Sequence, residues 1–387
     1  MVNARSISRL SNIDWDFAGA FSESAFSAIH WHPGRFASQI PASLIGVLSA
    51  PGGLVLDPFV GSGTTLVEAQ RLGRRSIGID LNPISCLATR AKTLALPAQR
   101  IQDAVRDISE EATASMAPQR QLRRGQSPRS QIPTTVQGSK WYTPNVLVHL
   151  GILFDLIHSF RGIKRLLAEA AFSALLLPVC RETRHWGYVC DNSTPKSDHE
   201  GEVLEEFLQT LARFVTAYKD RDDDILARSG SLQVIEESEV ICGSSKEILR
   251  RIPSASIDLV VTSPPYFGVC DYVKAQRLSM EWFGKEIEPL RAREVGARSK
   301  RHRGAAREAY LTELIEIFSE LKRTLRSKGR IAVIVGESKT RHTVLDDVRT
   351  GFRSIGFSLE LDLNRRVSSQ RRQAPSIRGE HVFVLST

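Results

Sequence analysis

The sequence predicts an α/β fold, a seven-stranded Rossmann-like sheet that carries a helical insertion. Three observations predict it. Short apolar runs, typical of strands buried on both faces, alternate with segments whose apolar residues recur at helical spacing. A glycine-rich turn, DPFVGSGTT, joins the first apolar run to a helix, as in nucleotide-binding sheets. The last two apolar runs follow each other without a helix, which indicates an antiparallel pair at the sheet edge.

The first part of the chain has the pattern of a strand, a helix and a parallel strand, the unit from which doubly wound sheets are built. Segments with apolar residues at helical spacing continue beyond this unit as far as residue 116. We therefore assign residues 1–110 to the N-terminal half of the sheet domain. In order, we expect a helix at 41–50, a strand at 53–57, a helix at 64–73, a strand at 74–82 and helices at 84–96 and 101–116.

Residues 111–232 read as an insertion made of a basic loop and helices. Residues 117–139 have almost no apolar periodicity and are rich in Gln, Arg, Ser and Pro, which predicts a long mobile loop. Three patterns with apolar residues at helical spacing follow, and an irregular polar segment separates the last two. We expect this insertion to carry the loop with which the protein recognises its partner. Its helices are expected at 146–160, 164–179 and 202–218.

Strand patterns resume in residues 233–387, which we assign to the C-terminal half of the same domain. The two runs at 357–367 and 380–387 are those expected to pair at the sheet edge. Together with the first part of the chain, these runs bring the expected number of strands to about seven. The other expected elements are strands at 232–242, 256–265 and 329–338, and helices at 245–253 and 313–325.

The composition of the 387 residues is that of an ordinary soluble globular protein, with 42% hydrophobic and 25% charged residues. No apolar run is long enough to span a membrane, and the N-terminal residues lack the apolar core of a secretory signal, so we expect a cytoplasmic protein. The five cysteines are scattered without a CxxC pair, which argues against disulfides and zinc ribbons. Cys180, His185 and Cys190 lie close in sequence but lack a fourth ligand, and we predict no metal site.

The net charge of +9 favours a polyanionic partner, because neutralising phosphates releases counterions. Arginine and lysine cluster in three segments, near residues 120–129, 291–303 and 365–378. Two of these segments are otherwise rich in Ser, Gly, Gln and Pro, as loops that grip a nucleic-acid backbone would be. A solvated basic surface is the alternative for any one cluster. The candidates for nucleic-acid contacts are Arg124, Arg298, Arg301, Arg371 and Arg372.

The turn DPFVGSGTT is the candidate cofactor site. Gly61 and Gly63 lie where a strand gives way to a helix, and their lack of side chains lets a bound molecule approach the backbone. The motif opens with an aspartate and no lysine follows, which suits a ligand with an amino group and a sulfonium better than a phosphate. Asp80 follows at the offset where an acidic side chain accepts hydrogen bonds from ribose hydroxyls. S-adenosylmethionine meets both requirements. The candidate cofactor-binding residues are Asp57, Pro58, Phe59, Gly61, Gly63, Thr64, Asp80, Asn82 and Ser244.

The second motif, TSPPY, suits the binding of a planar amine whose lone pair is delocalised into a ring. Pro264 and Pro265 stiffen the backbone and donate no N–H, which leaves the carbonyl of Pro264 to face the amine. Ser263 is expected to engage the edge of the ring, and Tyr266 to stack on it. These four residues are the candidate catalytic residues. A turn that merely ends a strand is the structural alternative.

The string DPFVGSGTTLVEAQRLGRRSIGIDLNP resembles the cofactor motif of amino-methylating DNA methyltransferases, and SIDLVVTSPPY resembles their catalytic motif. The preceding WHPGRFASQIPASLI resembles the segment that closes over the methionine end of the cofactor. The resemblance covers about residues 30–95 and 235–387, with the cofactor half first. It implies the seven-stranded sheet of S-adenosylmethionine-dependent methyltransferases. One departure is Ser244, where the family usually has an aspartate after the glycine.

The resemblance implies a site-specific enzyme that transfers a methyl group to an amino group of a flipped-out DNA base, and it implies DNA as the partner. A serine at the start of TSPPY favours cytosine N4 over adenine N6, which is the first alternative. RNA guanine or protein glutamine as acceptor is the second, and a catalytically silent DNA-binding protein is the third. A separate restriction endonuclease is a further partner that this family implies, with no membrane partner.

Overall fold

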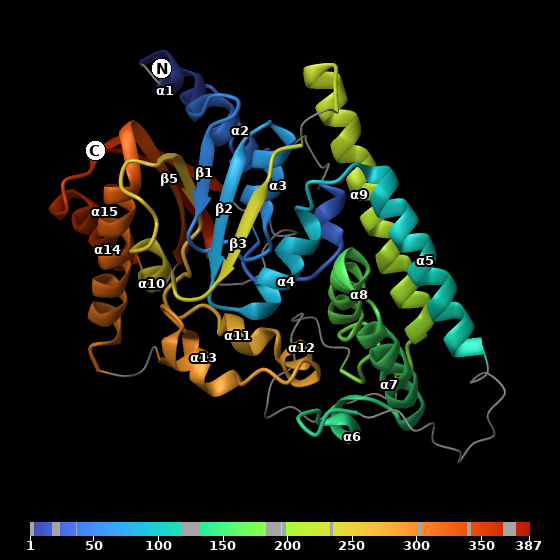
Figure 1. The fold of residues 1–387 in the computed structure, drawn as a ribbon. Helices are drawn as coiled ribbons and strands as arrows, with labels where there is room; N and C mark the ends of the chain where they lie inside the picture. The colour runs from blue at the N-terminus through green and yellow to red at the C-terminus, as the bar shows by residue number, and fades with distance from the viewer. Residues whose placement is uncertain are drawn as a thin grey trace.

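The computed structural model describes residues 4–17, 24–35, 37–117, 132–182, 195, 199–232, 235–300, 304–338, 342–366 and 377–387. A seven-stranded sheet lies at its centre, with helices on both faces and a helical module at one side (Figure 1). The strands are β1 (Leu54–Asp57), β2 (Arg75–Asp80), β3 (Ser238–Cys242), β4 (Ile257–Thr262), β5 (Leu325–Ser338), β6 (Ser358–Arg366) and β7 (Ile377–Ser386).

The strand order in the sheet is β3-β2-β1-β4-β5-β7-β6. The first five strands in this order pair in parallel, and β7 is antiparallel to both β5 and β6. This confirms the expected α/β sheet with an antiparallel pair at one end. The strand order reverses at β1, because β2 and β3 lie on one side of it and β4 on the other. The carboxyl ends of the parallel neighbours β1 and β4 therefore form the topological switch point where open α/β sheets bind ligands.

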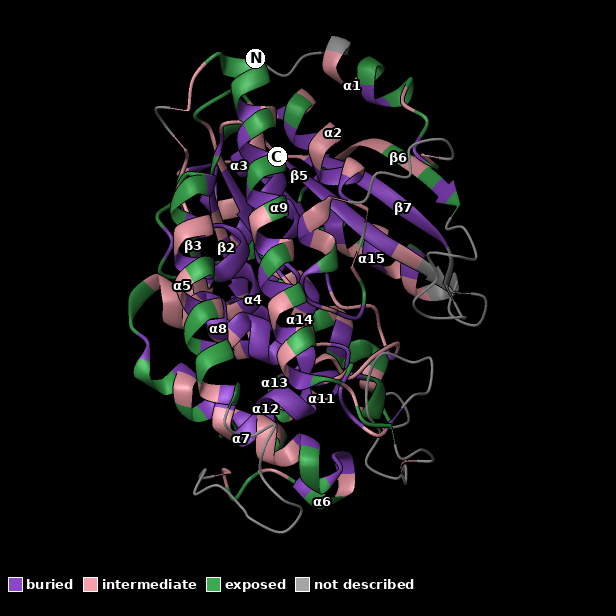
Figure 2. Ribbon diagram, turned by 90° about the vertical axis from the view of Figure 1, so that its right-hand side faces the viewer, coloured by how far each residue is buried: buried purple, intermediate pink, exposed green. Residues whose placement is uncertain are grey.

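Alternate residues of the strands face two separate cores, as the period of a strand requires. Leu56, Val260 and Ile331 pack toward α10, α14 and α15 on one face. Val55 and Leu259 pack toward α1 and α2 on the other. The central strands are therefore mostly buried, whereas the edge strands β3 and β6 are mostly half-buried or exposed and the surrounding helices expose one side (Figure 2). These helices are α1 (Ala4–Ser11), α2 (Gln39–Leu48), α3 (Thr64–Arg71), α4 (Pro83–Lys92), α10 (Ser245–Leu249), α14 (Ala306–Thr324) and α15 (His342–Ser354), with a 3₁₀ turn η1 (Ala25–Ala28).

The helical module consists of α5, α7, α8 and α9, which share one apolar core. Its ranges are α5 (Ala98–Met116), α7 (Pro144–Ser159), α8 (Gly162–Leu175) and α9 (Val203–Ser229), with the short α6 (Gly138–Trp141) beside them. The expected start of the insertion, residue 111, falls inside α5. The packing therefore places all of α5 with this module.

Three short helices connect the sheet to the helical module below the carboxyl ends of the strands (Figure 1). They are α11 (Tyr272–Ala275), α12 (Arg277–Trp282) and α13 (Ile287–Arg293). Trp282 of α12 lies among the aromatic rings of the module, with ring centroids 5.2 Å from Phe154 and 5.2 Å from Phe172. The segment that follows TSPPY is thus anchored in the module's core.

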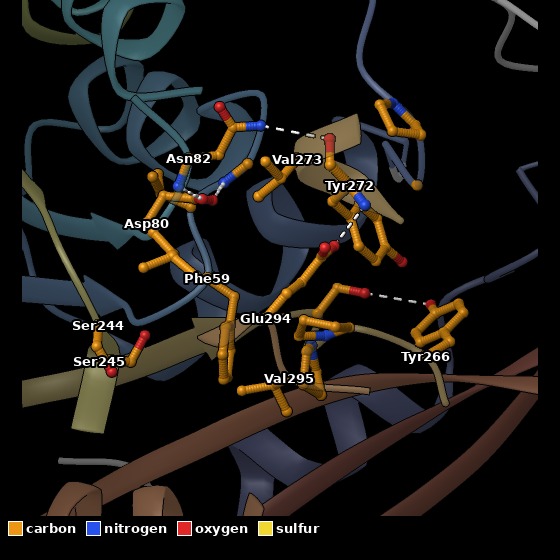
Figure 3. Close-up of a pocket in the computed structure, with 18 of the residues that line it drawn as sticks. Phe59, Asp80, Asn82, Ser244, Ser245, Tyr266, Tyr272, Val273, Glu294 and Val295 are labelled. Carbon is orange, nitrogen blue, oxygen red and sulfur yellow. Dashed lines mark hydrogen bonds between the residues drawn. The ribbon is translucent and has the colours of Figure 1, made fainter. Parts of the chain in front are cut away.

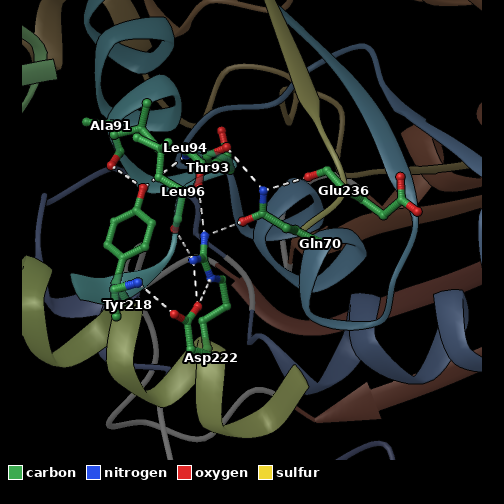
Figure 4. A network of polar contacts seen from close by, with 10 residues as sticks. Gln70, Ala91, Thr93, Leu94, Leu96, Tyr218, Asp222 and Glu236 are labelled. Carbon is green, nitrogen blue, oxygen red and sulfur yellow. Dashed lines mark hydrogen bonds and ion pairs between the residues drawn. The ribbon is translucent and has the colours of Figure 1, made fainter. Parts of the chain in front are cut away.

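A network of polar contacts joins the module to the sheet, and Figure 4 shows Asp222 of α9 and Gln70 of α3 within it. Arg221 of α9 is 1% exposed and donates to Gln70 Oε1 of α3 at 3.0 Å and to the carbonyl of Leu94 at 2.8 Å. Its other nitrogens donate to Asp222, whose second oxygen accepts the N–H of Ala98 at 2.6 Å. The guanidinium therefore connects α9, α3 and the start of α5 with its charge balanced.

Candidate active site

The two sequence motifs lie at adjacent strand ends. We call Asp57–Thr65 the glycine corner and Thr262–Tyr266 the proline corner. They follow β1 and β4, which are hydrogen-bonded neighbours in the sheet. The hydroxyl of Thr262 donates to Asp57 Oδ1 at 2.7 Å, and neither side chain is more than 1% exposed. The two corners therefore share one rim of the sheet.

A cleft enclosing about 960 Å³, its open mouth included, lies over this rim. Its size is that of a site for a nucleotide-sized ligand. Figure 3 shows Phe59, Asp80 and Asn82 on one side of it and Tyr266 and Tyr272 on the other, with Glu294 between them. Of the candidate site residues, those that line it are Phe59, Gly61, Asp80, Asn82, Ser244, Ser263, Pro264, Pro265 and Tyr266.

The glycine corner has backbone conformations that favour glycine. Gly61 and Gly63 have φ angles of +49° and +83°. The Gly61 N–H donates to Asp80 Oδ2 at 2.8 Å, and the Asn82 N–H donates to Asp80 Oδ1 at 2.8 Å. A Cβ on Gly61 would lie 3.1 Å from the His32 ring. The turn is thus closely packed, and Asp80 orients it from the end of β2.

Two buried aspartates give the rim negative charge at neutral pH. Burial raises the pKa of Asp57 to about 6, against the lowering effect of hydrogen bonds from Thr262, Thr65 and the Phe59 N–H. Burial also raises the pKa of Asp80 to about 6. Both carboxylates are therefore largely ionised at pH 7. Each Asp80 oxygen accepts one backbone N–H, which leaves further lone pairs for a ligand.

The remaining candidates of the glycine corner lie behind the wall of the cleft. Asp57 bridges β1 and β4 rather than lining the cleft. The Pro58 carbonyl accepts a hydrogen bond from Ser245. Thr64 begins α3, and a Cβ on Gly63 would lie 2.8 Å from Thr89 Oγ1. These residues position the corner from behind.

The proline corner is held by hydrogen bonds on both sides. The Ser263 hydroxyl donates to the Tyr266 hydroxyl at 3.2 Å, which in turn donates to Glu380 Oε1 of β7 at 3.3 Å. The Tyr310 hydroxyl donates to the Pro265 carbonyl at 3.1 Å. The Tyr266 ring lies against the backbone of Gly336 in β5, where a Cβ would overlap it. Neighbouring strands thus orient the corner.

Comparison with known proteins finds similarity to DNA methyltransferases. A family model described as DNA methylase matches residues 10–89, which include the glycine corner and β2. The type II methyltransferase M.MjaII of Methanocaldococcus jannaschii is 22% identical over 454 residues, covering 96% of this chain and 83% of that protein. These matches support the amino-methylating DNA methyltransferase family that the two motifs resemble.

Two other relatives are also named type II methyltransferases. M.MvaI of Kocuria varians is 26% identical over 240 residues, covering 60% of this chain and 51% of that protein. M2.DpnII of Streptococcus pneumoniae is 51% identical over 49 residues, covering 13% of this chain and 18% of that protein. The methyltransferase thus spans most of the first relative and about half of the second.

Several residues that line the cleft were not among the candidates, and His32, Tyr272 and Glu294 are notable among them. His32 lies on Gly61, its ring is neutral because burial lowers its pKa to about 3, and it stacks on Tyr272 with centroids 6.3 Å apart. Tyr272 follows Asp271 shortly after TSPPY, and this closeness to the second motif is a sequence signal for it. Glu294 is one acidic residue in a stretch of mixed charges, and no sequence pattern distinguishes it.

Asn82 and Ser244 line the cleft of the methyltransferase and also begin helices. The Asn82 side chain accepts the Ile84 N–H at 2.9 Å, capping α4, and donates to the Tyr272 carbonyl at 3.4 Å. Ser244 is the residue before α10. The departure from the usual aspartate at this position therefore faces the cleft directly.

Of the candidate DNA contacts, Arg298 lies within the described residues. It begins a 3₁₀ turn, η3 (Arg298–Lys300), and its N–H donates to the Cys270 carbonyl at 3.1 Å. Arg124, Arg301, Arg371 and Arg372 fall outside the described residues. His185 and Cys190, which lie near Cys180 in sequence, also fall outside the described residues.

Two kinds of feature are absent from the ranges that the structure describes. Within them, no group of three His, Cys, Asp or Glu side chains is arranged to hold a metal ion. No helix there combines the length and apolar character needed to cross a bilayer.

Proposed function

We propose that this DNA methyltransferase transfers a methyl group from S-adenosylmethionine to the N4 amino group of a flipped-out cytosine. One observation carries the proposal. The glycine corner and the proline corner meet at the switch point of one sheet, joined by the hydrogen bond from Thr262 to Asp57. A donor held at the first corner therefore faces an amine held at the second across a single cleft.

The residues of the cleft suit S-adenosylmethionine. The ionised Asp80, at the end of β2, is placed to accept hydrogen bonds from ribose hydroxyls. Phe59 offers an apolar face to the donor, and the open backbone at Gly61 allows its close approach. Ser244 stands near α10, where it supplies a hydroxyl in place of a carboxylate. When bound, the donor supplies an electrophilic methyl group on a sulfonium.

The proline corner would hold the acceptor. The carbonyl of Pro264 faces an N–H of the amine and restores electron density to its nitrogen, while Tyr310 orients the next peptide through the Pro265 carbonyl. Tyr266 lines the cleft, and a base that stacks on its ring gains about 1–3 kcal/mol. Attack then depends mainly on alignment, and the proton leaves after transfer.

Recognition of DNA would come from outside the sheet. The helical module is connected to the sheet through α11–α13 (Figure 1), and Arg298 begins η3 in the loop that follows α13. We propose that these elements and the basic loops bracket the duplex, with residues 111–232 carrying most of the sequence readout. A cognate restriction endonuclease is the natural partner for such an activity.

Methyl transfer is tested with purified protein, labelled donor and genomic DNA, followed by digestion to nucleosides. We expect labelled N4-methyldeoxycytidine. Sequencing of the methylated DNA with modification-sensitive chemistry then locates the target sequence. Labelled N6-methyldeoxyadenosine would show that adenine, not cytosine, is the acceptor. Label that resists DNase but not RNase, or that remains with protein, would move the activity to another substrate. Donor binding without any transfer would leave only a DNA-binding role.

A further inference from the structure

The cleft contains a buried acid with one unused oxygen. Glu294 is 5% exposed and lines the cleft beside the proline corner. One carboxyl oxygen accepts the Tyr272 N–H, whereas Oε2 is buried and has no hydrogen-bond partner among the described residues. A buried oxygen without a partner is unfavourable by about 1–3 kcal/mol, so a ligand that fills this position would remove that penalty.

The segment that carries Glu294 is fastened to the proline corner. The Gly268 N–H donates to the Gly296 carbonyl at 2.7 Å, and the same glycine lies against Tyr310, which holds the Pro265 carbonyl. Glu294 therefore lies in a segment fixed beside the proline corner, and both line the same cleft. Ser263 is the residue expected to engage the edge of the base. In this structure its hydroxyl donates a hydrogen bond to the Tyr266 hydroxyl.

The protonation state of Glu294 decides what it offers a base. Burial raises the pKa of Glu294 to about 8, partly offset by the backbone N–H groups of Tyr272 and Val273. The carboxyl is therefore mainly neutral at pH 7, and its unused oxygen carries a proton to donate. The other titratable groups that face it or its backbone are Asp80, Asp271, Cys270, Tyr272 and Lys300.

We propose that Glu294 is the base-selecting residue of the methyltransferase and donates a hydrogen bond to the ring nitrogen next to the amino-bearing carbon of the target base. This inference rests on the proposed function. Cytosine N3 and adenine N1 are acceptors, whereas thymine N3 and guanine N1 carry a hydrogen. A neutral acid at this place accepts cytosine and adenine and repels thymine and guanine, which have a carbonyl in place of the amino group beside that ring nitrogen.

The test uses DNA in which the target base lacks that ring nitrogen. The duplexes carry cytosine or 3-deazacytosine at the site found by sequencing, or adenine and 1-deazaadenine if adenine is the acceptor. Wild type is expected to lose about tenfold in kcat/KM on the deaza base. Glu294→Gln keeps both an acceptor and a donor and should retain this ratio of kcat/KM between the natural and the deaza base. Glu294→Leu should bring the ratio close to one. An unchanged ratio in Glu294→Leu would overturn the proposal.

Two further measurements keep the result decisive. Activity of wild type on cytosine should fall as pH rises through about 8, while Glu294→Gln should lack this decline. A decline shared by both proteins would overturn the proposal even if Glu294→Leu failed to fold. Calorimetry without DNA should give the same Kd of S-adenosylmethionine for wild type and Glu294→Gln. A tenfold change in this Kd would mean that Glu294 binds the methyl donor rather than the base. Wild-type protein that methylates no nucleoside would reject the proposed function itself, a result separate from these.

Discussion

At the residue scale, the acceptor side of the cleft depends on contacts that a single atom can disturb. Tyr266 has its hydroxyl between Ser263 and Glu380 and its ring against the backbone of Gly336. Glu380 is in turn paired with the buried Arg365, which donates to the Trp15 carbonyl at 2.9 Å. The ring of Tyr266 is therefore positioned by three strands and the N-terminal segment.

Replacing Gly336 by Ala should displace that ring. A Cβ at this position would overlap Tyr266, and a shift of about 1 Å at a reacting centre lowers rates by up to about 100-fold. We expect a 10- to 100-fold loss in the initial rate of DNA methylation. The matched control is Gly46→Ala, in an exposed part of α2 where a Cβ meets nothing within 4 Å. Equal rates for the two variants would show that Tyr266 tolerates the shift.

The neutral state of Glu294 also predicts a pH dependence of stability. The folded protein keeps this carboxyl protonated up to about pH 8, whereas the unfolded chain ionises it near its ordinary value of 4.5. Its stabilising contribution is thus complete below pH 4.5 and lost as pH rises through 8, by at most about 1.4 kcal/mol per pH unit. Glu294→Gln should gain thermal stability over wild type between pH 5 and pH 8. A difference in Tm that stays constant over this range would mean that Glu294 is ionised.

At the scale of elements, the active site depends on the pairing of two strand ends. β1 and β4 are parallel neighbours, and their last residues, Asp57 and Thr262, are linked by a buried hydrogen bond. Burial raises the pKa of Asp57, and the Thr262 hydroxyl works against this rise. The bond therefore aligns the glycine corner with the proline corner and keeps Asp57 ionised.

Thr262→Val keeps the side-chain shape and removes this donor. At pH 8 the ionised Asp57 would lose a charge-assisted hydrogen bond, and we expect the free energy of unfolding to fall by about 1–3 kcal/mol. The loss should be smaller at pH 5, below the pKa of about 6, because a protonated Asp57 depends less on the donor. Urea unfolding at the two pH values measures the difference. A larger loss at pH 5 than at pH 8 would contradict the assignment of charge.

At the scale of the whole molecule, the helical module and the sheet form one structure through α12 and α9. Trp282 carries the segment after the proline corner into the core of the module. Arg221 ties α9 to α3, which begins at the glycine corner. Both corners are thus connected to the part of the chain that we propose for target recognition.

Arg221→Met should weaken this connection strongly. Removing one partner of a buried ion pair leaves Asp222 without its guanidinium, and such changes reduce stability by about 3–5 kcal/mol. We expect a lower urea midpoint and faster proteolysis in α5–α9 than in the sheet. The exposed Lys219 on the same helix gives the control Lys219→Met, for which the midpoint should hardly change. Equal midpoints would show that apolar packing alone joins the module to the sheet.

The sequence by itself determined the seven strands, the two motifs and their place at strand ends, because apolar periodicity and glycine or proline turns are local signals. It also indicated Asp80, Ser263 and Tyr266, which line the cleft. Tertiary structure alone decided that Asp57 lies behind the rim and that Ser263 donates to Tyr266. It also placed Glu294 in the cleft, since burial and the lack of a partner arise from residues far apart in the chain. No local pattern of a single glutamate can carry that information.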